Sequence, residues 1–340
     1  MNSLQSLTRL VRYCAIWIGA VASLAASGTA AAGDKVVFGL NWIPQAEMCG
    51  FFQARETGLY AAAGLDVELV PGGPGMNMAQ MVAAGKYDMS MGSALTTLSM
   101  RKEGIPGVTV AAMLQKSPST VVSHPGQGIS KFEDLKGRPV AISNFGRAYQ
   151  WAWLKAKFGL DDSQLRPYVY NPAAFVADKT LSQQGYITED GFFLGNALGT
   201  EPVIMLLADR GYPDYATTVF TMQSMIDTRP DVVARFVRVS AQGFADCIDG
   251  DPSKTVAAIF AAAEVQTPEQ SRFKLAQMKK FKMVTGEDAE RLGVGAMTDE
   301  RWQAVFEAMS DLGVYPKDLD YKSAYTLRFT NTGVGRHATN

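Results

Sequence analysis

Short apolar runs alternate with helical stretches along much of this 340-residue chain. Residues 36–40 form an apolar, β-branched run that predicts a buried strand. Pro44 ends the strand, because proline lacks the backbone donor that a central strand needs, and residues 48–58 then predict a helix. The alternation predicts an α/β fold whose parallel sheets carry helices on both faces. The same strand pattern recurs at residues 64–70, 87–92, 108–114, 138–142, 166–169, 185–188, 203–208 and 217–221.

The order of these elements predicts two lobes joined by two crossings. The pattern breaks at residues 124–128 and strand character returns at Thr217, so we predict that the chain leaves the first lobe and later comes back to it. We expect residues 33–123 to begin lobe I, 124–214 to form lobe II, 215–330 to complete lobe I with the C-terminal helices, and 331–340 to be a loose tail. Residues 178–184 are predicted to be helical.

The N-terminal residues have the form of a secretory signal. Arg9 and Arg12 precede an apolar run at 13–24, and Ala30 and Ala32 fit the small-x-small cleavage rule. The apolar run is too short for a membrane span. We therefore expect residues 1–32 to be a cleaved signal peptide and the mature chain to lie in the periplasm.

Charge and cysteine content exclude several classes of protein. The chain has 32 Lys and Arg against 33 Asp and Glu, which does not favour a nucleic acid partner or an anionic membrane surface. Its two histidines, His124 and His337, lie far apart without a cysteine or carboxylate cluster, so we expect no metal site and no cofactor. Cys49 and Cys247 could pair in an oxidising compartment, but we favour two separate buried thiols.

The turn after the first strand holds candidate ligand-binding residues. Asn41, Trp42 and Gln45 lie where the first strand becomes the first helix, and ligands of open α/β sheets bind beyond the carboxyl ends of the strands. A tryptophan between amides can offer an aromatic face together with hydrogen bonds. The alternative is that Trp42 only fills the core. Glu47 is a further candidate, with a solvated loop glutamate as the alternative.

The chain resembles the periplasmic substrate-binding proteins of ABC importers, with their type II two-lobe fold and a ligand cleft between the lobes. More narrowly it resembles the thiamine-pyrimidine group, whose relatives bind formylaminopyrimidine, hydroxymethylpyrimidine or riboflavin; taurine, alkanesulfonate and nitrate binders are more distant. The fold this implies has a mixed or parallel sheet flanked by helices in each lobe. The resemblance is carried by Leu40-Asn-Trp-Ile-Pro44 and by residues 58–67, 134–137, 185–188 and 207–212.

The resemblance implies roles for particular residues. Trp42 would stack on one face of a heterocycle and Tyr186 on the other. Family members often place a glutamate four residues after this tyrosine, where the chain has Asp190. A carboxyl group there would bind the aminopyrimidine edge. The shorter Asp190 reaches less far, and Glu189 is the alternative. The family's Asn-x-x-His-x-Gly stretch is also altered here, to Gln45-Ala-Glu-Met-Cys-Gly50, so the contacts of the first loop differ.

Further polar residues fall at predicted strand ends that face the cleft, each with a cap or turn role as the alternative. Tyr149 is a better cleft candidate than Trp151 or Trp153, and Arg147 would suit an anionic ligand. The other candidates are Ser93, Thr96, Gln115, Ser117, Asn144 and Gly146.

These observations predict a binding protein that captures a small flat heterocycle, such as formylaminopyrimidine or hydroxymethylpyrimidine, and passes it to an inner-membrane permease. We expect a monomer. The alternative ligands are an alkanesulfonate, taurine, nitrate, an aromatic acid or riboflavin. An enzyme related to the eukaryotic pyrimidine synthases is the other alternative. The Cys-Cys-Cys-Phe-Cys motif of those enzymes is absent from the sequence, so we expect no catalytic residues.

Overall fold

A computed structural model describes residues 33–73, 75–168, 171–263 and 266–336. The predicted signal peptide, His337 and the end of the predicted tail lie outside these residues. Within the described residues, no helix combines the length and apolar character needed to cross a membrane.

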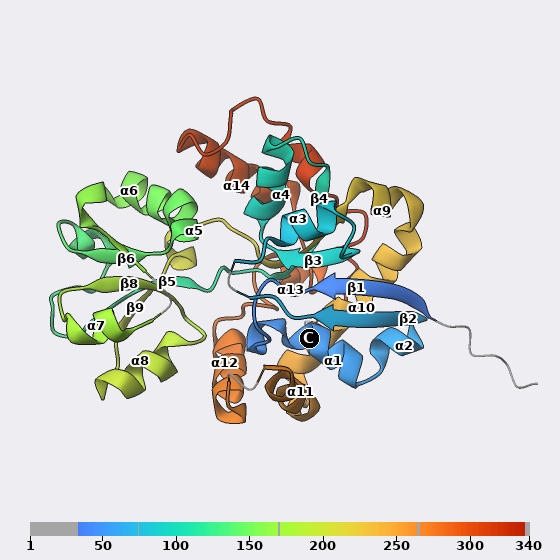
Figure 1. The fold of residues 1–340 in the computed structure, drawn as a ribbon, viewed down its shortest axis with the longest axis horizontal. Coiled ribbons are helices and arrows are strands. Elements are labelled where there is room, and N and C mark those ends of the chain that lie inside the picture. Colours follow the sequence, from blue (N-terminus) through green and yellow to red (C-terminus); the bar gives the residue numbers. More distant parts are fainter. Residues whose placement is uncertain (1–32, 74, 169–170, 264–265, 337–340) are drawn as a thin grey trace, which may run out of the picture. The chain divides into compact units, whose positions relative to one another are not determined.

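The first sheet has the strand order β2-β1-β3-β10-β4 (Figure 1). Strand β1 pairs in parallel with both β2 and β3, whereas β10 runs antiparallel between β3 and β4. Strand β10, the last of the sheet in sequence, therefore lies inside the sheet, between the earlier strands β3 and β4. The strands are β1 (Asp34–Gly39), β2 (Leu65–Val70), β3 (Met89–Gly92), β4 (Gly107–Leu114) and β10 (Ala216–Met222).

The second sheet has the order β7-β6-β8-β5-β9. Strand β6 pairs in parallel with β7 and β8, and β5 runs antiparallel between β8 and β9. Both sheets are thus mixed rather than parallel. In each sheet the antiparallel strand, β10 or β5, is the first strand after the chain crosses from the other sheet. The strands are β5 (Ser119–Ser123), β6 (Val140–Ile142), β7 (Leu165–Pro167), β8 (Ser182–Tyr186) and β9 (Val203–Leu206).

The chain passes between the sheets twice, at residues 115–118 and 207–215. Strand β5 belongs to the second sheet, although we expected residues 33–123 to lie in lobe I. The other predicted lobe limits remain predictions. Thr217, just after the second crossing, has a φ of 47°, a conformation that is uncommon for a branched residue.

Alternate residues of the central strands pack on opposite faces of the first sheet. Phe38 contacts the core beneath α1 and α10, whereas Val37 packs against the cluster beneath α3 and α4, as the two-residue period of a strand requires. The helices are α1 (Cys49–Glu56), α2 (Leu59–Ala62), α3 (Met78–Ala83), α4 (Ala94–Lys102), α5 (Asn144–Gly146), α6 (Ala152–Phe158), α7 (Ala173–Ala177), α8 (Asp190–Leu198), α9 (Gln223–Thr228), α10 (Pro230–Asp249), α11 (Ser253–Ala263), α12 (Pro268–Lys280), α13 (Asp288–Leu292) and α14 (Asp299–Asp311).

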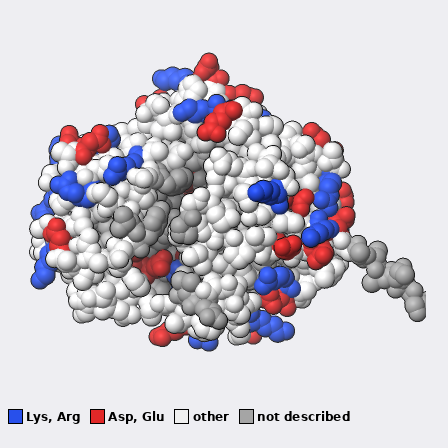
Figure 2. Space-filling view, in the orientation of Figure 1, with Lys and Arg blue, Asp and Glu red and all other residues white. Residues whose placement is uncertain are grey.

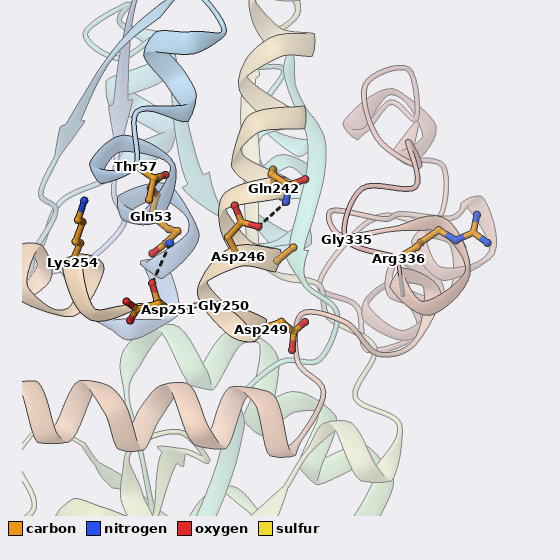
Figure 3. Close-up of a pocket in the computed structure, with 11 residues that line it drawn as sticks. Gln53, Thr57, Gln242, Asp246, Asp249, Gly250, Asp251, Lys254, Gly335 and Arg336 are labelled. Carbon is orange, nitrogen blue, oxygen red and sulfur yellow. Dashed lines mark hydrogen bonds between the residues drawn. The ribbon is translucent and has the colours of Figure 1, made fainter. Parts of the chain in front are cut away.

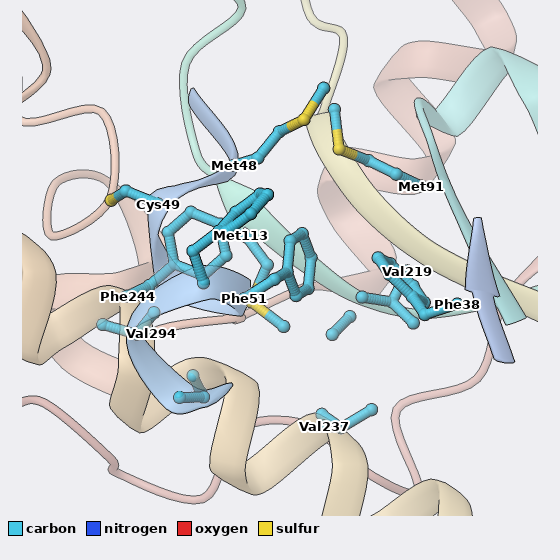
Figure 4. Close-up of a cluster of buried hydrophobic side chains, with 14 of the residues drawn as sticks. Phe38, Met48, Cys49, Phe51, Met91, Met113, Val219, Val237, Phe244 and Val294 are labelled. Carbon is cyan, nitrogen blue, oxygen red and sulfur yellow. The ribbon is translucent and has the colours of Figure 1, made fainter. Parts of the chain in front are cut away.

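Aromatic and sulfur-bearing side chains fill the core between the first sheet and its helices (Figure 4). Phe51 of α1 contacts Phe38 of β1 and Phe244 of α10, with ring centroids 4.6 and 5.1 Å apart. At the same interface Cys49 and Cys247 form a disulfide with Cα atoms 6.2 Å apart. The preference for separate thiols was therefore wrong, because the packing of α1 on α10 brings the two cysteines within bonding distance.

The structure also differs from the predicted elements around residue 180. Helix α7 ends at Ala177, and the Asp178 side chain accepts hydrogen bonds from the backbone and hydroxyl of Thr180. This turn stops the helix, and Ser182–Tyr186 then joins the second sheet as β8. The predicted helix over 178–184 was wrong because sheet pairing dominates there. Helix α8, which follows β8, was not predicted.

Residues 331–336, expected to be part of a loose tail, are held against the rest of the chain. The Asn331 side chain accepts a hydrogen bond from the Met297 backbone, and Val294 and Val334 are joined by a backbone hydrogen bond of 2.8 Å. This part of the predicted tail is therefore ordered by specific contacts.

Candidate ligand-binding site

Glu47 lies where segments from the two sheets meet. It belongs to the short helical turn Ala46–Met48, which follows β1, and its side chain is buried, with 6% of the residue exposed. Its Oε1 accepts a hydrogen bond from the hydroxyl of Thr188, which follows β8. The alternative interpretation of Glu47 as a solvated loop residue was therefore wrong.

Lys274 of α12 supplies a buried cation to this region, with a side chain only 3% exposed. Its Nζ lies 3.9 Å from Oε1 of Glu47, 3.3 Å from Oε2 of Glu189 and 3.5 Å from Oε1 of Gln45. The sequence analysis missed Lys274, because a lysine in an amphipathic helix is ordinarily a solvent-facing residue. No local sequence signal distinguishes it from the other lysines of α12.

Asp190 is the carboxyl group that is buried at the end of β8. Only 7% of the residue is exposed, and Oδ2 accepts a hydrogen bond of 3.2 Å from Thr120 of β5. The carboxyl group lies directly over Gly185, where a Cβ would overlap it. Burial and, to a smaller extent, the charge of Glu189 raise the pKa of Asp190 to about 7, against smaller lowering effects from the Tyr186 backbone, Thr120 and Lys274.

Glu189 differs from its neighbour. Its side chain is 42% exposed and pairs with Lys274. Asp190 is therefore the more buried of the two carboxyl groups. Glu189 contributes mainly through its ion pair with Lys274 of α12.

The two aromatic candidates differ in their surroundings. Trp42 is half-buried and packs against the core of the first sheet, and Tyr186, the last residue of β8, is 44% exposed. A half-exposed aromatic ring can present a face to a flat ligand. The arrangement in which the two rings sandwich a ligand stays a prediction. Of the neighbouring amides, Asn41 is exposed and Gln45 accepts from Lys274.

Tyr149, which follows strand β6 of the second sheet, forms a hydrogen bond with a helix that packs on the first sheet. It lies in the π-helical turn Arg147–Trp151, a conformation often found at functional sites. Its hydroxyl is 3.0 Å from Oγ of Ser99 in α4, and Ser99 is also 3.0 Å from the hydroxyl of Tyr315. Trp151 and Trp153 are both buried, as we expected for at least one of them.

The remaining candidates mostly use their polar groups within the protein. The Gln115 amide donates to the carbonyl oxygens of Ala112 and Ala296, and Ser117 donates to Ser119. Thr96 accepts from the backbone of Ser93, and the backbone of Gly146 donates to Ser143, whereas Asn144 is exposed. The structure therefore brings Gln45, Glu47, Glu189 and Asp190 into one region but does not place these other residues in it.

One face of the molecule is hollowed, and Figure 2 shows acidic atoms with a trace of basic surface in the hollow. A separate depression of about 640 Å³ lies beside α1 and α10 (Figure 3). Its lining includes Gln53, Asp246, Asp251 and Lys254 but none of the predicted site residues. The sequence-based candidates therefore do not coincide with this depression.

Solved structures with the same fold include several binding proteins. The periplasmic aliphatic sulphonate binding protein SsuA from Escherichia coli superimposes with a TM-score of 0.63 at 13% identity, covering 86% of this chain and 91% of that one. The alkanesulfonate-binding protein SsuA from Xanthomonas axonopodis pv. citri, bound to MOPS, gives 0.62 at 14% identity, covering 87% and 99%. The desulfurization enzyme DSZB gives 0.57 at 13% identity, covering 89% and 99%. These similarities show the fold alone.

Sequence comparison finds relatives of two kinds. The riboflavin-binding protein RibY of Chloroflexus aurantiacus is 22% identical over 308 residues, covering 88% of this chain and 87% of its own. The 4-amino-5-hydroxymethyl-2-methylpyrimidine phosphate synthase THI11 of Saccharomyces cerevisiae is 29% identical over 116 residues, which is 34% of each chain. This chain thus matches about a third of the synthase.

A family model described as NMT1/THI5 like matches residues 45–254. The match spans more than half of the chain and includes both crossings, all of the second sheet and the residues around Glu47 and Asp190. On this evidence the chain belongs to the NMT1/THI5-like family, and its fold is that of the periplasmic binding proteins.

Proposed function

We propose that this protein is the solute-binding component of an ABC importer and captures a small flat heterocycle that bears an amine, such as formylaminopyrimidine or hydroxymethylpyrimidine. The observation that carries the proposal is the buried carboxyl group of Asp190 beside the half-exposed ring of Tyr186. Its place is the periplasm, and its partner is an inner-membrane permease. The mature chain acts as a monomer without a cofactor or catalytic residues.

Asp190 has the chemistry to bind an aminopyrimidine edge. A carboxyl group whose pKa is raised to about 7 exists in both protonation states near neutral pH. The protonated form has one donor and one acceptor, which match the ring nitrogen and exocyclic amine of an aminopyrimidine. The ionised form accepts from the amine and from a protonated ring nitrogen. Both forms therefore support recognition of the same ligand edge.

The charge of this region disfavours a sulfonate or nitrate. Glu47, Glu189 and Asp190 surround the single ammonium of Lys274. An anion placed here would face these carboxyl groups, and uncompensated charge in a buried site is costly. The same surroundings favour a neutral or cationic ligand.

One observation favours a second candidate, the binding of an aromatic acid. The Nε of Arg147 is buried and has no hydrogen-bond partner among the described residues. A guanidinium group with a free donor is suited to a carboxylate. In this alternative the ligand is anionic, and Arg147 rather than Asp190 determines its orientation.

Thermal unfolding of the chain from Gly33 onward, with a panel of compounds, separates these candidates. The panel holds 4-amino-5-hydroxymethyl-2-methylpyrimidine, thiamine, riboflavin, taurine, an alkanesulfonate, nitrate and benzoate. A compound at 100 times its Kd adds about 2.7 kcal/mol to the free energy of unfolding. Stabilisation by the aminopyrimidine supports the proposal. Stabilisation by benzoate alone supports the Arg147 alternative, and stabilisation by taurine, the alkanesulfonate or nitrate alone refutes the heterocycle as ligand.

A further inference from the structure

Glu47 has one buried carboxylate oxygen that nothing in the described residues contacts through a hydrogen bond. The side chain is 8% exposed. Oε1 accepts from Thr188 and lies 3.9 Å from Nζ of Lys274. Oε2 is buried and has no hydrogen-bond partner among the described residues. The contacts of Oε1 hold the carboxylate in one orientation, and Oε2 is left available.

An available buried carboxylate oxygen indicates a missing donor. Leaving such an atom without a hydrogen bond is unfavourable, and buried polar atoms are paired in most native structures. The neighbouring polar atoms do not fill this role. Gln45 Oε1 and Glu189 Oε2 are acceptors that lie near the same ammonium as Glu47. Oε1 of Gln266, whose amide nitrogen lies 3.3 Å from Oε1 of Gln45, is another of the buried acceptors that have no partner among the described residues.

The charges identify the kind of donor that fits. Glu47 and Glu189 carry two carboxylates, and Lys274 supplies one ammonium between them. Without counting Asp190, these three residues therefore carry one excess negative charge, with Glu47 and Lys274 buried and Glu189 partly exposed. A neutral donor would satisfy the hydrogen bond, but only a cation satisfies both the hydrogen bond and the charge.

We propose that Glu47, Thr188 and Lys274 form a second ligand subsite, which binds a protonated primary amine on a side arm of the heterocycle. We call these three residues the amine subsite. This inference rests on the proposed function and extends it, because it adds a second recognition point to Trp42, Tyr186 and Asp190, which we call the ring site. Oε2 of Glu47 accepts from the amine, while Thr188 and Lys274 fix the carboxylate.

Residues of the amine subsite are sequence neighbours of ring-site residues in two separate segments. Glu47 is in the turn that begins shortly after Trp42, and Thr188 lies between Tyr186 and Asp190. Helix α12, which carries Lys274, packs against the turn Ala46–Met48. Lys274 also lowers the pKa of Asp190, so the two sites are close, and a pyrimidine with a one-carbon aminomethyl arm is a suitable probe of both.

A matched pair of compounds tests the amine subsite. They are 4-amino-5-aminomethyl-2-methylpyrimidine and 4-amino-5-hydroxymethyl-2-methylpyrimidine, which share the ring and differ only in the arm. Titration calorimetry gives the Kd of each for the unaltered protein, for Glu47→Gln and for Glu68→Gln. Glu68 is a control because it is an exposed glutamate of β2, paired with Lys35.

We expect the unaltered protein to bind the aminomethyl compound about 10- to 100-fold more tightly, as a charge-assisted hydrogen bond predicts. Glu47→Gln should reduce this preference to about threefold or less, because the amide donates where Oε2 accepts. Glu68→Gln should retain the full preference. Glu47→Gln should also give one cooperative unfolding transition and a folded circular dichroism spectrum, which excludes misfolding as the cause.

Each other outcome is decisive. Equal binding of the two compounds by the unaltered protein overturns the amine subsite while the proposed function stands, and this comparison needs no variant. If Glu47→Gln loses affinity for both compounds to the same extent, Glu47 has a structural role and the subsite is overturned. Binding of neither compound by the unaltered protein overturns the proposed function, and the amine subsite with it.

Discussion

The hydroxyl of Thr188 donates a hydrogen bond to Glu47 across 141 positions of sequence. The contact joins the segment after β8 to the turn after β1, so it exists only when the carboxyl ends of the two sheets are close together. The hydrogen bond therefore ties these two segments together in the folded chain.

Replacing Thr188 with valine should destabilise the protein while keeping the shape of the side chain. Thr188 is fully buried, and its loss leaves Glu47 with Lys274 alone. We expect a decrease of about 1–3 kcal/mol in the free energy of unfolding, measured in urea. Thr200→Val, at an exposed threonine, should change it by less than about 0.5 kcal/mol. Equal values for the two variants would contradict this prediction.

Removing either aromatic ring should weaken ligand binding more than it affects the fold. We expect Trp42→Ala and Tyr186→Ala each to raise the Kd for 4-amino-5-hydroxymethyl-2-methylpyrimidine by about 10-fold or more, since stacking contributes about 1–3 kcal/mol per base. Phe193→Ala is the matched control, because Phe193 is a similarly exposed aromatic residue, at 46%. Retention of full affinity in both site variants would refute the aromatic pair.

A methyl group at Gly185 should displace the carboxyl group of Asp190. The Cβ of alanine at this position would overlap the carboxyl oxygens. We expect Gly185→Ala to raise the Kd for the same pyrimidine by about 10-fold or more, as loss of a charged hydrogen bond does.

Gly191→Ala is the control for this experiment. A Cβ there would make only ordinary contacts, the nearest at 3.5 Å from Phe273, and alanine is favoured over glycine in a helix. This variant should bind normally. If Gly185→Ala also binds normally, Asp190 does not hold the ligand in the proposed way.

Stability should fall as pH rises from about 4 to 7. The folded pKa values of Asp190 and Asp214 are both raised to about 7 from an ordinary value of 3.8, chiefly by burial. In this range the folded state holds more protons than the unfolded state, so raising the pH favours unfolding. The stabilisation that each protonated carboxyl group provides is fully present below its ordinary pKa. By pH 7 the free energy of unfolding has fallen by at most about 4 kcal/mol for each group. Urea unfolding of Asp190→Asn and Asp214→Asn should show a flatter profile than the unaltered protein; identical profiles would be evidence against the raised pKa values.

The disulfide between Cys49 and Cys247 should be detectable by thiol titration. The denatured chain from Gly33 onward should show no free thiol before reduction and two after it. Reduction should lower the free energy of unfolding by about 2–4 kcal/mol, because the bond closes a long loop in the unfolded chain. Two free thiols in the unreduced protein would contradict the bond.

The sequence allowed the α/β class and most strands to be predicted, because these depend on local patterns. Pro44 and the glycines mark element ends, and Asp190 lies at a strand end whatever its partners. The burial of Lys274 could not be predicted, since it depends on packing beside Gln45, 229 positions away.

The errors have the same origin. Residues 178–184 have no strong local preference, and pairing of β8 with β5 and β6 fixes their conformation. The pairing of Cys49 with Cys247 depends on how α1 and α10 meet, 198 positions apart. In each case a contact distant in sequence determined what the local pattern left open.

The interior position of β10 has a consequence for the order of folding. The second sheet is formed by one continuous stretch, from β5 to β9, so all its strands are available once that stretch has been synthesised. The first sheet cannot close until β10 enters between β3 and β4. We therefore expect the earlier strands of that sheet to remain incompletely paired until more than half of the chain has left the ribosome. A protein built this way remains unable to complete its fold during most of its synthesis.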